Sequence, residues 1–376
     1  MRILVLVHEY PPVGGGGGQA AKSICQGLAR KGHEVLVLTA HLQGLPREDF
    51  IEGVRVKRLP SARRLPFKAG LTALVGFLIS GLMAGVSHAR LWKPNLIHVH
   101  FAVPAGPVAW ILKRIYKIPY VLTVHLGDVP GGVPEKTGAW FRWVYPFTPI
   151  VWREASRVIA VSDYTRQLAL KHYPVQIQVI PNGIDMPQSF HNAIQIGTPP
   201  RIAFAGRFVP QKNPLTVVEI LAELKDLPWK CIMLGDGPLR EDVESEIKRR
   251  GMEDRFELTG WVLPDDVIAQ FGRSDILFMP SISEGLPVVG LQALTMGLAI
   301  VASQVGGFID LVTQGENGYL LKNDDVRGFT QALRVLLSDS NRLHEFKEAS
   351  KEKARRFDLG RIVDEYIRIF QEIAIE

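Results

Sequence analysis

The sequence predicts an α/β protein made of two modules, each a doubly wound parallel sheet. Short apolar runs alternate with helical stretches through both halves of the chain. At 376 residues the chain has the length of about two ordinary domains. A turn-rich segment, residues 181–187, and the polar stretch 188–200 separate the two alternations. We therefore expect a first domain over residues 1–185, a linker over 186–200 and a second domain over 201–355.

In the first half, an apolar run at residues 2–7 predicts a strand, and residues 20–31 carry apolar side chains at helical spacing before Gly32. A glycine-rich loop, residues 11–18, stands between them. The further strands predicted in this half cover residues 34–39, 54–58, 96–100, 120–124, 157–161 and 178–180.

The second half repeats the alternation. Its predicted strands cover residues 202–205, 230–234, 256–258, 276–279, 300–302 and 318–320. Its predicted helices include residues 215–224, 240–249 and 265–271. At the end of the chain, the apolar spacing of residues 361–373 predicts an amphipathic helix, so we expect residues 356–376 to pack back toward the first domain.

Charge and composition narrow the class of protein. Hydrophobic residues make up 47% of the chain and charged residues 22%, as in soluble globular proteins. Residues 1–190 carry 22 Lys and Arg against 10 Asp and Glu, a net charge of +12, whereas residues 191–376 carry 22 against 28, a net charge of −6. The basic half could meet nucleic acid, an anionic membrane or a phosphorylated substrate. Nucleic acid is the least supported partner, because no nucleic-acid-binding signature is present.

The compartment is predicted from the cysteines and the first residues. Cys25 and Cys231 lie far apart and form no metal-ligand spacing, which fits small core residues in a reducing compartment. The short apolar run at the start soon reaches His8 and Glu9, so it resembles a first strand rather than a signal peptide. We expect a cytoplasmic protein.

Residues 69–89 contain no Lys, Arg, Asp or Glu and follow a basic patch. Their length permits a membrane span, but four glycines and several polar residues favour a helix packed in the protein or lying on a membrane surface. The basic patch comprises Arg55, Lys57, Arg58, Arg63, Arg64 and Lys68.

Two loops after predicted strands suggest ligand contacts. The five glycines at 14–18 let a ligand approach the backbone closely, although a merely flexible loop is the alternative. No Gly-Lys-Ser/Thr follows, so this is not a P-loop. After the strand at 276–279, a short loop with Glu284 and Gly285 leads into a helix predicted over residues 292–296 and ended by Gly297. Such a loop presents backbone N–H groups to an anion, and Glu284 could grip sugar hydroxyls. An ordinary strand–helix loop with a surface Glu is the alternative.

Charged and polar candidates gather at the carboxyl ends of the predicted strands, where ligands bind in open α/β sheets. Arg207 and Lys212 suit a diphosphate, because one is a forked donor and the other a mobile point charge. A solvated surface pair is the alternative reading. If the two modules face each other, these residues, the glycine loop and the Glu284 loop converge on one cleft.

Taken in order, the motifs resemble those of retaining glycosyltransferases of family 4, a class with the GT-B fold of two Rossmann-like domains facing across a cleft. The resemblance covers nearly the whole chain. It is carried by Tyr10-Pro-Pro with Gly15-Gly16, by Asn95–His100 and Val121–His125, by Val161-Ser162 and Ile180–Asp185, by Ala205–Lys212 and Leu234–Pro238, and by Ser281–Gly297 with Gly306-Gly307.

The resemblance implies a role for each matched residue. Catalytic contacts are implied for His125 near the transferred sugar, for Arg207 and Lys212 at the diphosphate, and for Glu284, the first Glu of the family's Glu-x7-Glu motif. Binding contacts with the donor or acceptor are expected from Gly15, Gly16, Asp128, Gly285, Leu286, Val288 and Gln292.

One departure from the family pattern falls at Gln292, where the second Glu of the motif is expected to hold the ribose hydroxyls. A glutamine keeps an acceptor oxygen and adds donors, so ribose binding can survive, with donor affinity in question. No Asp-x-Asp is present, so no metal or other cofactor is expected. The leaving group would be met by Arg207, Lys212 and backbone dipoles.

The sequence thus predicts an enzyme that moves a hexose from a UDP- or GDP-sugar to a glycan or lipid-linked acceptor with retention of configuration. The resemblance implies attack from the face that the diphosphate leaves, with the phosphate assisting as base. Contact with the inner face of an anionic membrane is a further expectation. A GT-B phosphorylase, a nucleotide-sugar epimerase and a catalytically silent sugar-nucleotide-binding protein remain as alternatives.

Overall fold

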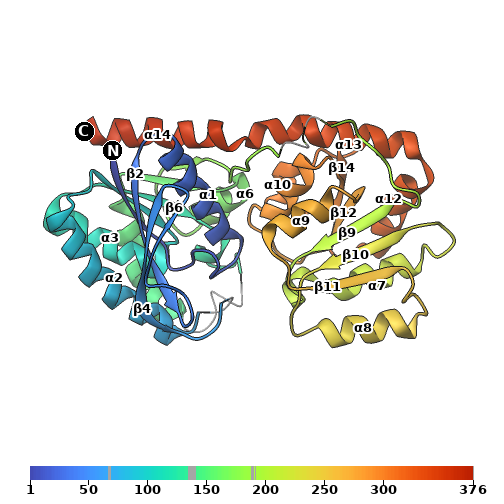
Figure 1. Cartoon of the computed structure of the whole chain (residues 1–376), viewed down its shortest axis with the longest axis horizontal. Helices are drawn as coiled ribbons and strands as arrows, with labels where there is room; N and C mark the ends of the chain where they lie inside the picture. Colours follow the sequence, from blue (N-terminus) through green and yellow to red (C-terminus); the bar gives the residue numbers. More distant parts are fainter. Residues whose placement is uncertain (67–68, 134–140, 188–189, 191, 376) are drawn as a thin grey trace. The chain divides into compact units, whose positions relative to one another are not determined.

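The structure, a computed structural model, describes residues 1–66, 69–133, 141–187, 190 and 192–375 (Figure 1). The chain divides into two units, one formed by Met1–Gly183 with Leu359–Glu376 and the other by Ile184–Asp358. The predicted linker, residues 186–200, lies at the start of the second unit, and Gln188, Ser189 and His191 of that linker fall outside the described residues.

The first unit is built on an eight-stranded sheet in the order β3-β4-β2-β1-β5-β6-β7-β8. Every neighbouring pair is parallel except β3 and β4, which are antiparallel. Its strands are β1 (Arg2–Leu6), β2 (Glu34–Leu42), β3 (Glu48–Ile51), β4 (Val54–Arg63), β5 (Leu96–His100), β6 (Tyr120–Val124), β7 (Arg157–Ala160) and β8 (Ile177–Val179).

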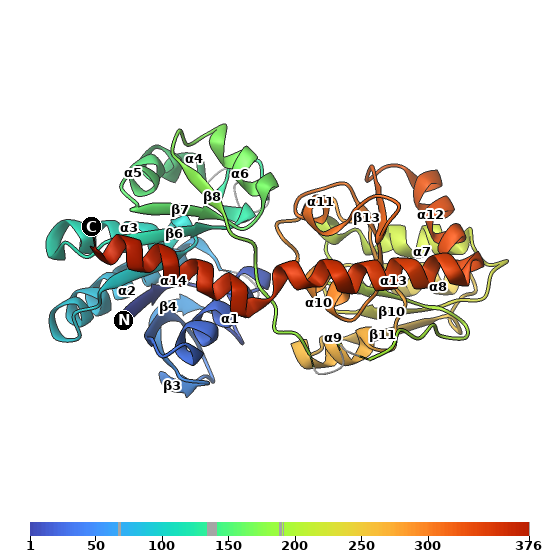
Figure 2. The ribbon, with the colours of Figure 1, turned by 90° about the horizontal axis from the view of Figure 1, so that it is seen from above.

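Helices cover both faces of this sheet, because successive side chains of a strand point to opposite faces. Leu4 and Leu6 pack in a core formed with α2 (Leu71–Leu91), α3 (Ala102–Tyr116), α5 (Thr148–Arg153) and α6 (Asp163–Leu170). Ile3 and Val5 pack in a second core with α1 (Gly16–Arg30) and α14 (Leu359–Ile375). The last helix of the chain thus belongs to the core of the first unit (Figure 2).

The second unit is built on a six-stranded parallel sheet in the order β11-β10-β9-β12-β13-β14. Its strands are β9 (Arg201–Ala205), β10 (Lys230–Leu234), β11 (Phe256–Gly260), β12 (Ile276–Met279), β13 (Ala299–Ser303) and β14 (Gly318–Leu321). Its helices are α7 (Pro214–Ala222), α8 (Arg240–Arg249), α9 (Pro264–Phe271), α10 (Val288–Thr295), α11 (Phe308–Leu311), α12 (Val326–Ser338) and α13 (Ser340–Ala354).

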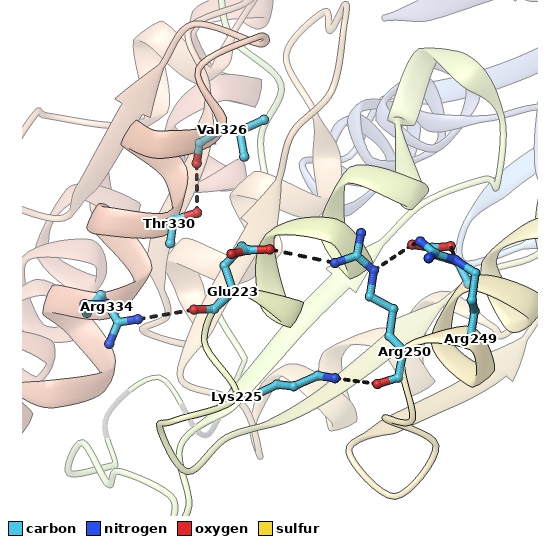
Figure 3. Close-up of polar contacts among 8 residues, drawn as sticks. Glu223, Lys225, Arg249, Arg250, Val326, Thr330 and Arg334 are labelled. Carbon is cyan, nitrogen blue, oxygen red and sulfur yellow. Dashed lines mark hydrogen bonds and ion pairs between the residues drawn. The ribbon is translucent and has the colours of Figure 1, made fainter.

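A charged network joins three of these helices at the surface of the second unit (Figure 3). Arg334 of α12 donates to the carboxylate of Asp226 and to the carbonyl of Glu223, just beyond α7. Arg250, at the end of α8, pairs with Glu223 and with Glu246. Exposed ion pairs contribute little singly, so this network adds modest support to the packing of α7, α8 and α12.

The sequence predictions of the elements are largely confirmed. Two differences concern the functional loops. Helix α1 begins at Gly16 rather than Ala20, so part of the predicted glycine loop is helical. Helix α10 begins at Val288, directly after Pro287, rather than at Gln292, so residues 288–291 are helical instead of part of the loop. The short strand β3 and the helices α12 and α13 were not predicted.

The segment predicted as an uncharged helix forms α2, the helix in the described residues that is long and apolar enough to cross a membrane by length and composition. This helix packs in the first unit against β4 and α3. Lys68 of the predicted basic patch lies outside the described residues.

Candidate functional site

Lys212 and Glu284, two residues predicted to act on a ligand, form a close ion pair in the second unit. Lys212 ends a short 3-10 turn after β9, and its Nζ lies 2.6 Å from Oε1 of Glu284 in the loop after β12. The side chains are 15% and 6% exposed, so both charges are largely withdrawn from water. A buried charge needs a partner, and here each charge satisfies the other. The Glu284 carboxylate is therefore already paired with a cation, and any sugar hydroxyl would bind it in the presence of that cation.

The backbone reinforces this pairing of the two loops. The side-chain amide of Gln211 donates to the carbonyl of Ser283 at 2.9 Å, and the N–H of Ile282 donates to the carbonyl of Gln211 at 2.8 Å. These two hydrogen bonds hold the loop at the carboxyl end of β9 next to the loop at the carboxyl end of β12. This arrangement fixes Lys212 and Glu284 without relying on their ion pair alone.

Two glycines after β13 hold the Glu284 loop from its other side. A Cβ on Gly306 would lie 1.6 Å from the carbonyl oxygen of Glu284, and a Cβ on Gly307 would lie 2.3 Å from that of Gly285. The N–H of Gly307 also donates to the carbonyl of Gly285. Gly306 has a φ of +54°, a conformation that side chains disfavour. Only glycine fits at these positions, so this pair sets the path of the loop.

Arg207 follows β9 and is partly buried. The loop after β10 supports its backbone, because the N–H of Phe208 donates to the carbonyl of Asp236 at 2.9 Å. A Cβ on Gly237 would lie 2.6 Å from the carbonyl oxygen of Phe208, which explains the glycine there. Among the described residues, none accepts a hydrogen bond from the Arg207 guanidinium. Its five donors therefore remain available to an anion.

Helix α10 begins immediately after the Glu284 loop with no side-chain cap and no acidic residue in its first turn. The N–H groups at its start, which include that of Val288, carry the positive end of the helix dipole. Leu286 is buried, and Gln292 lies one turn beyond Val288 with a side chain that is mostly buried. Glu284 and Gln292 thus belong to a loop and a helix, respectively, as the sequence predicts.

In the first unit, the glycine run forms the start of α1. No side chain caps this helix, and its first turn carries no acidic residue. A Cβ on Gly17 would lie 2.6 Å from the ring of Phe101 and 3.3 Å from Nδ1 of His125, whereas a Cβ on Gly15 would meet nothing within 4 Å. Gly14 and Gly18 are packed as closely on Glu9, where a Cβ would lie 2.5 Å and 2.7 Å away, respectively. The backbone at Gly15 is open to approach.

His125 follows β6, and its ring stacks on Phe101 with a centroid separation of 4.5 Å. Asp128 holds the surrounding backbone: one carboxylate oxygen accepts from the N–H of His125 and the other from the N–H of Ala102, both at 2.8 Å. Asp128 is 4% exposed. The structure gives it a positioning role between β5 and β6, and its predicted contact with substrate stays a prediction.

Two buried histidines on β5 extend this cluster and were missed by sequence reasoning. His100 Nδ1 lies 3.4 Å from His125 Nε2, and His98 Nε2 lies 2.9 Å from the hydroxyl of Thr123, which in turn lies 3.2 Å from that of Tyr366 on α14. Burial lowers the pKa of His98 to about 3 and that of His100 well below its usual value, and neighbouring histidines add to both effects. Both rings are therefore neutral at pH 7. Their alternation as His98-Val-His100 was the available signal.

A second missed feature lies behind the glycine run. Arg63 is buried, pairs with Glu9 at 3.6 Å and donates to the carbonyl of Pro66 at 3.0 Å. The N–H of Gly14 also donates to that carbonyl, at 2.7 Å. Arg63 therefore ties the end of β4 to the glycine run, although the sequence separates the two by about fifty residues. The pKa of Arg63 is lowered by burial, an effect that Glu9 opposes.

Comparisons with known proteins agree with this architecture. The family model "Glycosyltransferase Family 4" matches residues 14–187, and "Glycosyl transferases group 1" matches residues 188–353. The chain is 30% identical over 346 residues to 2-deoxystreptamine glucosyltransferase of Streptomyces kanamyceticus, covering 83% of this chain and 87% of that protein.

Solved structures share the fold. Sucrose-phosphate synthase from Thermosynechococcus elongatus superposes with a TM-score of 0.86 at 20% identity, over 99% of this chain and 98% of that chain. Anabaena HepE in complex with UDP-glucose gives a TM-score of 0.75 at 20% identity, over the whole of both chains.

The two sheet units and their similarity to solved structures show the GT-B fold, and the family models show a glycosyltransferase. The chain belongs to the family 4 glycosyltransferases, and its C-terminal half matches the model of the glycosyl transferases group 1.

Proposed function

We propose that this protein transfers a hexose from a nucleotide diphosphate sugar to a glycan or lipid-linked acceptor, with retention of anomeric configuration. The second unit would hold the donor and the first unit the acceptor. The observation that carries the proposal is the Lys212–Glu284 pair, with Arg207 on the same segment after β9, because these residues bring two cations and one carboxylate to the carboxyl ends of β9 and β12.

Each group has a task in such a reaction. The diphosphate gains charge as the sugar–phosphate bond breaks, and fixed cations stabilise that charge most strongly in the transition state. Arg207 and the N–H groups at the start of α10 suit the phosphates. Lys212 would divide its charge between the diphosphate and Glu284, which in turn accepts from sugar hydroxyls. Attack from the face that the diphosphate leaves, with a phosphate oxygen taking the acceptor proton, would give retention.

The names of relatives support the donor class. One relative is named a glucosyltransferase, and HepE is described in complex with UDP-glucose. These names motivate a UDP-hexose as the first donor to test, with GDP-sugars as the second.

The test has two stages. Thermal shift with a panel of UDP- and GDP-sugars identifies the donor, and an acceptor screen with that donor follows. We expect a sugar adduct whose anomeric proton, followed by NMR from the start of the reaction, keeps the configuration of the donor. An inverted product would contradict retention.

Two other outcomes would replace the proposal. Donor epimerisation without acceptor, or release of the sugar by inorganic phosphate, would indicate an epimerase or a phosphorylase. Tight donor binding with no turnover on any acceptor would indicate a silent binding protein.

A further inference from the structure

The outer face of α2 is a continuous apolar stripe. Leu71, Val75, Ile79 and Met83 are four residues apart and 55%, 46%, 58% and 71% exposed, respectively. Side chains at this spacing lie on one face of a helix. A soluble surface rarely leaves so many large apolar side chains in one row without a function.

The inner face of the same helix is made mostly of small residues. Gly76 packs on the backbone of β4, where a Cβ would lie 2.9 Å from Ser61, and Gly85 packs on α3, where a Cβ would lie 2.8 Å from Leu112. Phe77 is fully buried between these glycines. This close packing places the inner face of α2 in the core of the first unit, which favours a helix on the surface of the folded unit over a membrane span.

Cations outnumber anions around the stripe, although Arg58 and Arg63 are buried and Glu48 of β3, paired with Lys57, acts electrostatically on His88 of α2. Residues 53–127, which contain β4, α2 and α3, carry 11 Lys and Arg and no Asp or Glu. Arg64 is exposed before the stripe, and Arg90 and Lys93 are exposed beyond it. Arg90 also donates to the hydroxyl of Tyr116, which joins the ends of α2 and α3. Positive charge therefore stands at both ends of the apolar row.

We propose that this face, the stripe Leu71, Val75, Ile79 and Met83 with its flanking cations, docks the protein on an anionic lipid bilayer, with α2 lying parallel to the surface. Large apolar side chains enter the boundary between headgroups and acyl chains, while Arg and Lys at the edges meet anionic headgroups. A second copy of the chain fits less well. An antiparallel pairing of two stripes would set the Arg64 end of one copy against the Arg90 and Lys93 end of the other.

The test uses site-specific labelling of the full chain. Cys25 and Cys231 are buried, so Met83→Cys can be labelled selectively with an environment-sensitive fluorophore. We expect a blue shift of its emission with vesicles of about 30% phosphatidylglycerol in phosphatidylcholine, and none with phosphatidylcholine alone. Phe50→Cys is the matched control, because Phe50 is 69% exposed in the same unit but lies on β3. A shift of equal size at both labels, or with both vesicles, would overturn the proposal.

Flotation with the same vesicles separates the contributions. The pair Ile79→Gln with Met83→Gln keeps good helix formers and should lower the partition coefficient about tenfold or more. The pair Arg90→Gln with Lys93→Gln should lower it on the order of tenfold at moderate salt, and less at high salt. Wild-type partition of both double variants would overturn the proposal.

Two further outcomes distinguish the other occupants of this face. A dimer seen by sedimentation that Ile79→Gln with Met83→Gln abolishes would assign the stripe to a second copy. Resistance of the protein to extraction by alkaline carbonate would indicate a span. Binding is measured without donor or acceptor, so this proposal can fail while the proposed activity stands, and the converse holds as well.

Discussion

The two units hold their candidate site residues in opposite ways. In the second unit, Lys212 and Glu284 are charged partners 2.6 Å apart, and glycines fix their loops by close backbone contact. In the first unit, the uncapped start of α1 lies against the stacked rings of Phe101 and His125, with neutral His100 beyond them. In the second unit a charged pair lies between two loops, whereas in the first unit a glycine backbone packs on aromatic and histidine rings, with the buried Arg63–Glu9 pair and Asp128 next to them.

The largest expected effect concerns the charged pair. Lys212→Met should lower kcat/KM about 30- to 1000-fold, because an oriented charge at a diphosphate contributes roughly 2–4 kcal/mol to transition-state stabilisation. Steady-state kinetics of the folded variant provides the measurement. Lys225→Met is the matched control, since Lys225 lies on the surface of the same unit beyond α7. Turnover by Lys212→Met at the wild-type rate would remove Lys212 from the site.

Variants of Glu284 and Lys212 can distinguish the contribution of the pair to catalysis from its contribution to stability. Glu284→Gln should lower kcat at least about tenfold, since a hydrogen bond to a charged group contributes roughly 1.5–3 kcal/mol. Each single variant leaves one largely buried charge unpaired, whereas the double variant leaves none. The losses in the free energy of unfolding should therefore be clearly non-additive, with the double variant more stable than the sum of the single losses predicts. Additive losses in denaturant titrations would show that the two charges do not depend on each other.

Substitutions in the glycine run test the packing of the first unit around α1. Gly17→Ala should destabilise the first unit by about 1–3 kcal/mol, because its Cβ would overlap the ring of Phe101. Gly15→Ala places its Cβ in open space but puts alanine at the N-cap of α1, so it should cost less stability than Gly17→Ala, about 0.5–1 kcal/mol, and lower activity, if a ligand approaches the backbone there. Thermal unfolding and kinetics of the two variants distinguish the roles. Equal stability of both variants would contradict the packing described for Gly17.

The buried histidines predict how stability depends on pH. His98 and His100 have a lowered pKa in the folded protein and an ordinary value near 6.5 when unfolded. Between these values the unfolded chain binds protons that the folded protein does not, so the free energy of unfolding falls as pH falls below about 6.5. The expected slope is on the order of 1.4 kcal/mol per pH unit for each histidine.

Denaturant titrations at about pH 7 and pH 5, on either side of the ordinary histidine pKa, measure this slope. His98→Gln keeps a hydrogen-bonding side chain without the titration and should remove about half of the histidine contribution. His344→Gln is the control, because His344 is exposed on α13. An unchanged slope in His98→Gln would contradict the neutral cluster.

Much of this architecture could be predicted because the strands are buried apolar runs with clear ends. β5, β6, β10 and β12 have the predicted boundaries. β3 was missed because its four residues include Glu48 and Asp49 and form only an edge strand. Helix α1 begins inside the glycine run because tertiary packing of Gly17 and Gly18 outweighs the poor helix propensity of glycine.

The candidate site could be predicted as a set of residues but not as a set of contacts. Lys212 and Glu284 were both singled out, yet their pairing depends on β9 and β12 being neighbours in the sheet. The contact between Arg63 and Glu9 likewise joins residues that local spacing cannot relate. Long-range pairing is decided by the strand order, and no short motif encodes it.

The smallest expected effect concerns Gln292, the position at which this chain departs from its family pattern. Gln292 lies on α10, while Glu284 lies in the loop before it, so the two side chains can contact different parts of a donor. Gln292→Ala should weaken the free nucleoside diphosphate and the intact donor alike, by a few-fold to about tenfold, since a neutral hydrogen bond contributes roughly 0.5–1.5 kcal/mol. Gln292→Glu should keep the fold and tighten ribose binding, because an ionised carboxylate accepts a stronger hydrogen bond from a ribose hydroxyl than the neutral amide oxygen of Gln292 does. Glu284→Ala should instead weaken the donor, whereas the nucleoside diphosphate, which has no sugar, should bind as well or more tightly because Lys212 no longer shares its charge with Glu284. Isothermal titration of each variant with both ligands makes the comparison. If Glu284→Ala weakens both ligands equally and Gln292→Ala weakens neither, the assignment of these residues to sugar and ribose is wrong.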